Sequence, residues 1–129
     1  MNINVNDLTI GQAKSIAAVF GNGSNNETPI GNQFIGQHVI IRTYSAGVWF
    51  GVLSEKSGNE VIVKNARRMW RWWAKESISL SAVAKFGIDQ SKSKIAPSVE
   101  SVWLEAIEII PTTTESTKLI EGAADVEAE

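Results

Sequence analysis

The residues best suited to chemistry lie together in residues 64–73, which read KNARRMWRWW. This segment holds three of the five tryptophans and three of the four arginines of the chain. Arginine supplies paired donors to phosphate or carboxylate, and tryptophan supplies a flat face on which a base can stack. The segment therefore indicates recognition of a flat or anionic group.

A strand over residues 64–73 divides these side chains between two faces. Ala66, Arg68, Trp70 and Trp72 share one face, while Arg67, Met69, Arg71 and Trp73 share the other. Both faces mix aromatic and basic groups, unlike a strand that only covers a core. Two interpretations stay open: a recognition surface, or a buried tryptophan pair whose arginines bind acidic neighbours.

The small set of reactive residues argues against catalysis. The chain has no cysteine and a single histidine, His38, and it lacks a glycine-rich phosphate loop and a zinc motif. We expect no enzyme activity, no cofactor and no metal site, and we interpret His38 as structural. Glu100, Glu105 and Glu108 alternate with apolar residues, and this pattern fits a solvated strand face better than a metal site.

Charge is distributed unevenly along the 129 residues. The net charge is −2, and residues 100–129 carry eight acidic residues against one lysine. An overall acidic balance argues against bulk duplex binding. No apolar run approaches the ~20 residues of a membrane span, so we expect no membrane association.

The elements that must position these residues follow from hydropathy and turn signals. Residues 38–44 and 48–54 predict a hairpin, and residues 60–64 and the arginine-tryptophan segment predict two further strands. Gly51 predicts a bulge or bend. A short helix is expected within residues 77–87, and one bulged strand or two short strands within 99–110, before Pro111.

We therefore predict a mainly β fold with short helices (α+β), a small antiparallel barrel or curled sheet. The predicted parts are an N-terminal amphipathic helix and flexible linker in residues 1–36, a β-rich core in 37–111, and an acidic tail in 112–129 that is disordered or at best a frayed helix. Exposed aromatic residues favour a homo-oligomer.

Four blocks of the sequence resemble a small domain family of tailed phages and prophages whose function is unknown. The blocks are residues 7–14 (DLTIGQAK), 42–48 (RTYSAGV), 65–68 (NARR) with Trp70 and Trp72, and 105–111 (EAIEIIP). The resemblance implies a phage protein in the cytoplasm of the host bacterium. By analogy of size and setting, it suggests an anti-defence role in which a nucleotide immune signal is sequestered.

The leading hypothesis is a non-enzymatic accessory protein that binds a small nucleotide-like ligand. The ligand-binding residues that we predict are Arg42, Tyr44, Ser45, Gly47, Arg67, Arg68, Trp70, Arg71 and Trp72. One alternative is a protein that binds single-stranded nucleic acid by stacking. Another is a phage structural or assembly component in which the tryptophan cluster forms a subunit contact.

Overall fold

The computed structural model describes residues 30–127. The elements in chain order are η1 (Asn32–Phe34), β2 (His38–Thr43), β3 (Val48–Ser57), β4 (Glu60–Arg71), α1 (Leu80–Phe86), β5 (Lys94–Ile95), β6 (Val99–Pro111) and α2 (Thr114–Glu121). The predicted N-terminal helix and most of the predicted linker lie outside the described residues.

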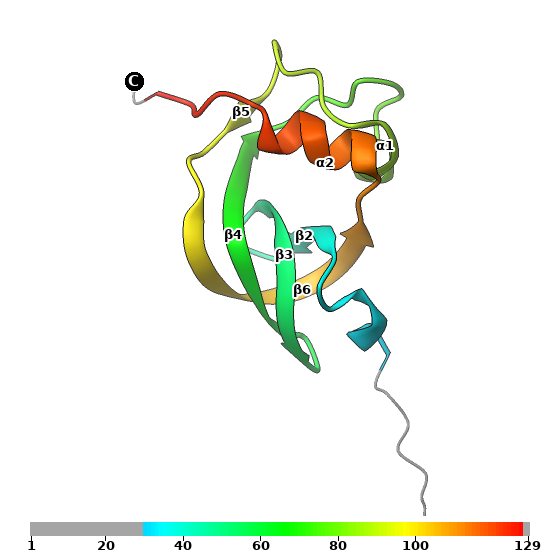
Figure 1. Cartoon of the computed structure of the whole chain (residues 1–129), viewed down its shortest axis with the longest axis vertical. Coiled ribbons are helices and arrows are strands. Elements are labelled where there is room, and N and C mark those ends of the chain that lie inside the picture. Colours follow the sequence, from blue (N-terminus) through cyan, green and yellow to red (C-terminus); the bar gives the residue numbers. More distant parts are fainter. Residues whose placement is uncertain (1–29, 128–129) are drawn as a thin grey trace, which may run out of the picture. The chain divides into compact units, whose positions relative to one another are not determined.

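The five strands form one antiparallel sheet in the order β3-β2-β6-β4-β5. A further antiparallel pairing of β3 with β4 closes β2, β3, β4 and β6 into a ring. Figure 1 shows this ring with α1 and α2 lying together at one end. The prediction of a mainly β fold with short helices is confirmed.

Apolar residues of β2 point alternately to two separate cores. Val39 and Ile41 pack with residues of β3, β4 and β6 in one cluster, whereas Ile40 packs in a second cluster with residues of the two helices. Both faces of β2 are therefore covered. This arrangement explains its continuous apolar run.

Gly51 allows two strands to approach closely. The pairing of β3 with β4 shifts register between Phe50 and Val52. A Cβ atom at Gly51 would lie 2.6 Å from Val63 Cγ1 and 2.7 Å from the carbonyl oxygen of Lys64. The predicted bulge is thus confirmed, and its physical cause is backbone proximity.

The arginine-tryptophan segment is not a separate strand. Residues 64–71 continue the preceding strand as β4, in which Asn65 adopts a positive φ of 49°, and Trp72 and Trp73 follow the end of the strand. Beyond this irregularity, Arg67 and Met69 are buried and Arg68 and Trp70 are exposed. Along residues 67–70, the buried face is therefore the predicted face that carries Arg67 and Met69.

Helix α1 begins and ends as its sequence predicts. The Ser79 hydroxyl accepts a hydrogen bond from the Ala82 amide at 3.1 Å, and Gly87 follows the helix with φ of 96°. Leu80, Val83 and their buried neighbours face the core.

The predicted disordered tail is corrected by the structure. Residues Thr114–Glu121 form α2, in which Ile120 is fully buried and the Ser116 hydroxyl donates to the Val83 carbonyl at 2.6 Å. Beyond the helix, the Val126 amide donates to the Ile95 carbonyl at 2.9 Å. A few well-placed contacts hold this acidic segment against the core despite its low content of large apolar groups.

Helices long and apolar enough to cross a bilayer are absent from residues 30–127.

Candidate functional site: a basic aromatic pocket beside β5

A pocket of about 560 Å³ lies where the end of β4 meets β5 and the loop before it. Its lining, here called the basic pocket, consists of Arg71, Trp72, Trp73, Ser91, Lys92, Ser93 and Lys94. Three of these residues carry positive charge and none carries negative charge. The pocket is therefore suited to an anionic ligand with a flat part.

Strand pairing brings two of the cations together. Arg71 on β4 is the register partner of Lys94 on β5, after a register shift between Met69 and Arg71. Residues directly opposite in an antiparallel pair have neighbouring side chains. Arg71 and Lys94 thus form one wall of positive charge from two strands.

The loop that carries Lys92 is fixed to the segment after β4. The Trp73 amide donates to Ser93 Oγ at 3.0 Å, and the Asp89 amide donates to the Trp73 carbonyl at 2.8 Å. Asp89 also accepts from the amide and the hydroxyl of Ser91, at 3.0 and 2.6 Å. These bonds give the short loop a defined shape around the pocket.

Asp89 remains ionised beside this loop. The hydrogen bond from the Ser91 hydroxyl holds the pKa of the Asp89 carboxyl below its ordinary value, and the positive charge of Lys92 acts in the same direction. Asp89 does not line the pocket. Its negative charge supports the turn at the edge of the cationic lining.

Two tryptophans next to the pocket are each accompanied by a lysine. Lys92 Nζ lies 5.3 Å from the ring centroid of Trp73, and Lys94 Nζ lies 5.5 Å from that of Trp70. Both rings are more than half exposed, at 54% for Trp73 and 62% for Trp70. These distances fall within the ~6 Å range of cation–π attraction. A planar ligand can therefore meet aromatic and cationic groups together.

Trp72 has a different role from its exposed neighbours. It is half-buried and packs against the core cluster that contains α1. Because it also lines the pocket, it connects the pocket wall to the core.

Of the predicted ligand-binding residues, Arg71 and Trp72 line the basic pocket, and Trp70 adjoins it through Lys94. Arg68 lies outside the lining. Its guanidinium carbon is 4.6 Å from the ring centroid of Trp49, a residue of β3.

Arg67 is directed into the protein rather than toward the pocket. Its side chain is only 8% exposed. The guanidinium donates to the carbonyls of Ala96, Ile120 and Ala123 at 2.8–2.9 Å, and to the Asp125 carboxylate at 2.8 Å. It thereby joins β4 to the segment after β5 and to the end of α2, and these partners occupy its donors.

The remaining predicted residues gather around the β2–β3 turn. Arg42 Nε donates to Glu108 on β6 at 2.8 Å. Tyr44 and Ser45 line a second pocket, and Gly47 supplies the positive φ of 87° that the turn requires. The structure does not bring these four residues into the basic pocket.

Sequence reasoning missed five residues of the basic pocket. Trp73 was left out of the predicted set, and Ser91, Lys92, Ser93 and Lys94 fall in a stretch with the composition of a polar linker. The available signal was the alternation of lysines 92 and 94 with serines, a period of two typical of a strand edge.

Residues 30–127 contain no cluster of three or more histidine, aspartate or glutamate side chains that could hold a metal ion.

The fold and pocket together define a small, mainly β protein with a basic aromatic pocket. The chain belongs to the family described as a domain of unknown function (DUF6948), whose model matches residues 36–120. The resemblance to a family of unknown function is thereby confirmed, while the phage setting stays a prediction. Comparison with curated proteins and with solved structures gave no match.

Proposed function

We propose that this protein binds a nucleotide-like anion in the basic pocket, without catalysing a reaction on it. The observation that carries the proposal is the pocket lining, in which Arg71, Lys92 and Lys94 accompany the indole rings of Trp72 and Trp73 with no carboxylate among them. Phosphate groups need cationic donors, and a base needs an aromatic face.

The arrangement suggests a role for each part of the lining. The adjacent Arg71 and Lys94 are placed to bind phosphate oxygens, and Arg71 can do so with two parallel hydrogen bonds. The exposed face of Trp73 is available to a base. Ser93 Oγ already accepts from the Trp73 amide, so its own hydrogen is free to be donated to the ligand.

The size of the pocket fits this class of ligand. Its volume of about 560 Å³ falls within the ~300–1,000 Å³ typical of small-molecule sites. Because the pocket is built from two strands and a hydrogen-bonded loop, it is largely pre-formed, which lowers the entropic cost of binding.

The biological extension of this proposal is sequestration. A phage accessory protein in the host cytoplasm that binds a nucleotide immune signal without destroying it would lower the free concentration of that signal. A homo-oligomer would raise the number of sites per particle. Both features belong to the proposal: sequestration rests on the resemblance of the sequence blocks to a phage family, and the homo-oligomer rests on the exposed aromatic residues.

The test is native mass spectrometry of the protein purified gently from cells that make such signals, followed by thermal-shift measurements with a nucleotide panel. We expect an added mass that matches a nucleotide, and a higher Tm with that nucleotide. Arg71→Ala should abolish both effects. Lys64→Ala, which removes one exposed positive charge from β4 outside the pocket, should preserve them.

Absence of any added mass and of any Tm change across the panel would contradict the proposal.

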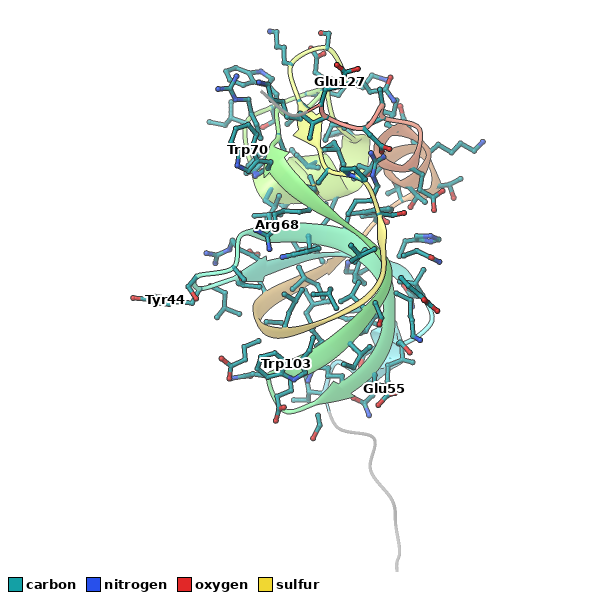
Figure 2. All side chains as sticks on the ribbon, turned by 90° about the vertical axis from the view of Figure 1, so that its left-hand side faces the viewer. Tyr44, Glu55, Arg68, Trp70, Trp103 and Glu127 are labelled. Atoms are coloured by element: carbon teal, nitrogen blue, oxygen red, sulfur yellow. The ribbon has the colours of Figure 1, made fainter. Side chains whose placement is uncertain are left out.

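A specific observation also favours a second candidate, single-stranded nucleic acid. Figure 2 shows Trp70 and Arg68 along the same side of the molecule, and both residues are exposed. A strand lying along this side could stack bases at roughly 1–3 kcal/mol each. Such binding should strengthen with oligonucleotide length and weaken steeply with salt, whereas a pocket ligand should show no length dependence.

A further inference from the structure

A second pocket, about 270 Å³ in volume, lies at the β2–β3 turn and the middle of β6. Its lining includes Tyr44, Asn59, Trp103 and Glu105, and none of its lining residues is cationic. We call it the acidic pocket. Its residues are entirely different from those of the basic pocket.

Strand register places a second carboxylate beside Glu105, the carboxylate that lines this pocket; the second, Glu60, lines another pocket together with Trp103 and Lys56. Glu60 on β4 is the direct partner of Glu105 on β6. Like charges directly opposite on a sheet repel each other. Neither carboxylate takes part in an ion pair among the described residues. The two side chains therefore place two negative charges next to each other, with Lys56 as a neighbouring cation in the pocket that Glu60 lines.

Trp103 lies on the same face as these two carboxylates. It precedes Glu105 by two residues on β6, and its Nε1 donates to Glu60 Oε1 at 3.0 Å. This bond holds the indole at a defined position although its side chain is 54% exposed. Tyr44, which is 91% exposed, adds a second aromatic group to the lining. Figure 2 shows both side chains along one side of the molecule.

We propose that the acidic pocket binds an arginine side chain of a partner polypeptide. A guanidinium carries planar donors that can reach two carboxylates at once, and it stacks on tryptophan more readily than an ammonium does. The Glu60–Glu105 pair and the indole of Trp103 supply these two kinds of partner within one small surface.

The size and surroundings of the pocket fit a side chain of a polypeptide. Its volume falls below the ~300 Å³ at which small-molecule pockets begin. Ile107, two residues beyond Glu105 on β6, also lines the pocket and is half-exposed, so it offers apolar contact to residues next to the arginine. An anion is excluded here by the same carboxylates that attract the guanidinium.

The test uses the full chain labelled with ¹⁵N and the peptide acetyl-Gly-Arg-Gly-amide as probe. We expect the indole N–H resonance of Trp103 to shift saturably with the peptide, and the resonances of Trp72 and Trp73 to stay in place. A citrulline peptide of the same length, which lacks the charge, should cause no shift. Glu105→Gln should weaken binding about tenfold.

Glu100→Gln removes a carboxylate elsewhere on β6 and serves as the matched control. It should leave peptide affinity unchanged.

Two results would overturn the inference. One is equal response to the arginine and citrulline peptides, or none to either, with the fold intact. The other is a dimeric protein that does not respond to the peptide and becomes monomeric on Glu105→Gln. A second copy of the chain would then occupy the pocket. Nucleotide binding by the Glu105→Gln variant should stay normal, so this test is independent of the proposed function.

Discussion

Arg71 and Lys94 are direct partners in the pairing of β4 with β5, although they lie far apart in the sequence. The ammonium of Lys94 also lies 5.5 Å from the centre of the Trp70 ring. One short strand thus gathers a guanidinium, an ammonium and an indole beside a single pocket. This relationship carries the proposed nucleotide-binding function.

Replacing Trp73 with alanine should weaken nucleotide binding by about 1–3 kcal/mol, the usual contribution of one stacked base. The reason is that Trp73 is more than half exposed and lines the basic pocket. Isothermal titration calorimetry measures the change. Trp103→Ala removes an equally exposed tryptophan at a distant pocket and should leave nucleotide affinity unaltered; equal losses in the two variants would count against the assignment.

Arg67→Met should destabilise the fold by about 3 kcal/mol, because the buried carbonyls that now accept from the guanidinium would lose charged hydrogen bonds. Urea denaturation followed by circular dichroism measures this loss. Arg68→Met, at an exposed position, provides the matched control and should change the free energy of unfolding by less than about 1 kcal/mol. If the two variants were equally stable, the structural role of Arg67 would be refuted.

Ile120→Ala should lower the free energy of unfolding by about 2–5 kcal/mol, since this side chain is fully buried in the core cluster beneath α2. Thermal unfolding and hydrogen exchange of α2 amides both report the effect. Ile107→Ala, where the side chain is half-exposed, should cost far less. Rapid exchange throughout α2 in the unmodified protein would show that the helix is not part of the folded unit.

Asp89→Asn should alter the pH dependence of stability. The Asp89 pKa is lowered in the folded state, so its ionised form contributes stability above the unfolded pKa of ~3.9, and this contribution is lost as pH falls through the lowered value. We therefore expect the variant to have a lower Tm than the unmodified protein at pH 7. The difference should shrink at pH values below the lowered pKa.

Tm measured by calorimetry across this pH range provides the check. A Tm difference that stays constant from pH 7 downward would show that the Asp89 charge is not responsible.

Much of the fold can be predicted from the sequence because its signals are local. The hairpin turn with Gly47 and the Ser79 cap each depend on neighbouring residues, and the structure confirms the elements that they predict. Helix α2 was harder to predict because its stability comes from a few tertiary contacts, such as the Ser116 hydroxyl with Val83, and not from a long apolar stripe.

The site could be predicted only in part. The period of two separates Arg67 from Arg68, but it cannot say which of the two faces the core. The buried position of Arg67 depends on carbonyls that the fold brings from the end of α2. Strand β5 spans only two residues, and the alternation of lysine and serine before it does not identify the partner strand, so the pairing of Lys94 with Arg71 becomes visible only in the structure.

The central claim is tested most directly by titrating the ¹⁵N-labelled chain with a panel of nucleotides while observing the five indole N–H resonances. Nucleotide binding in the basic pocket predicts saturable shifts for Trp72 and Trp73, a shift for Trp70 through its contact with Lys94, and fixed positions for Trp49 and Trp103. Absence of shifts with every nucleotide, or shifts confined to Trp49 and Trp103, would contradict the account.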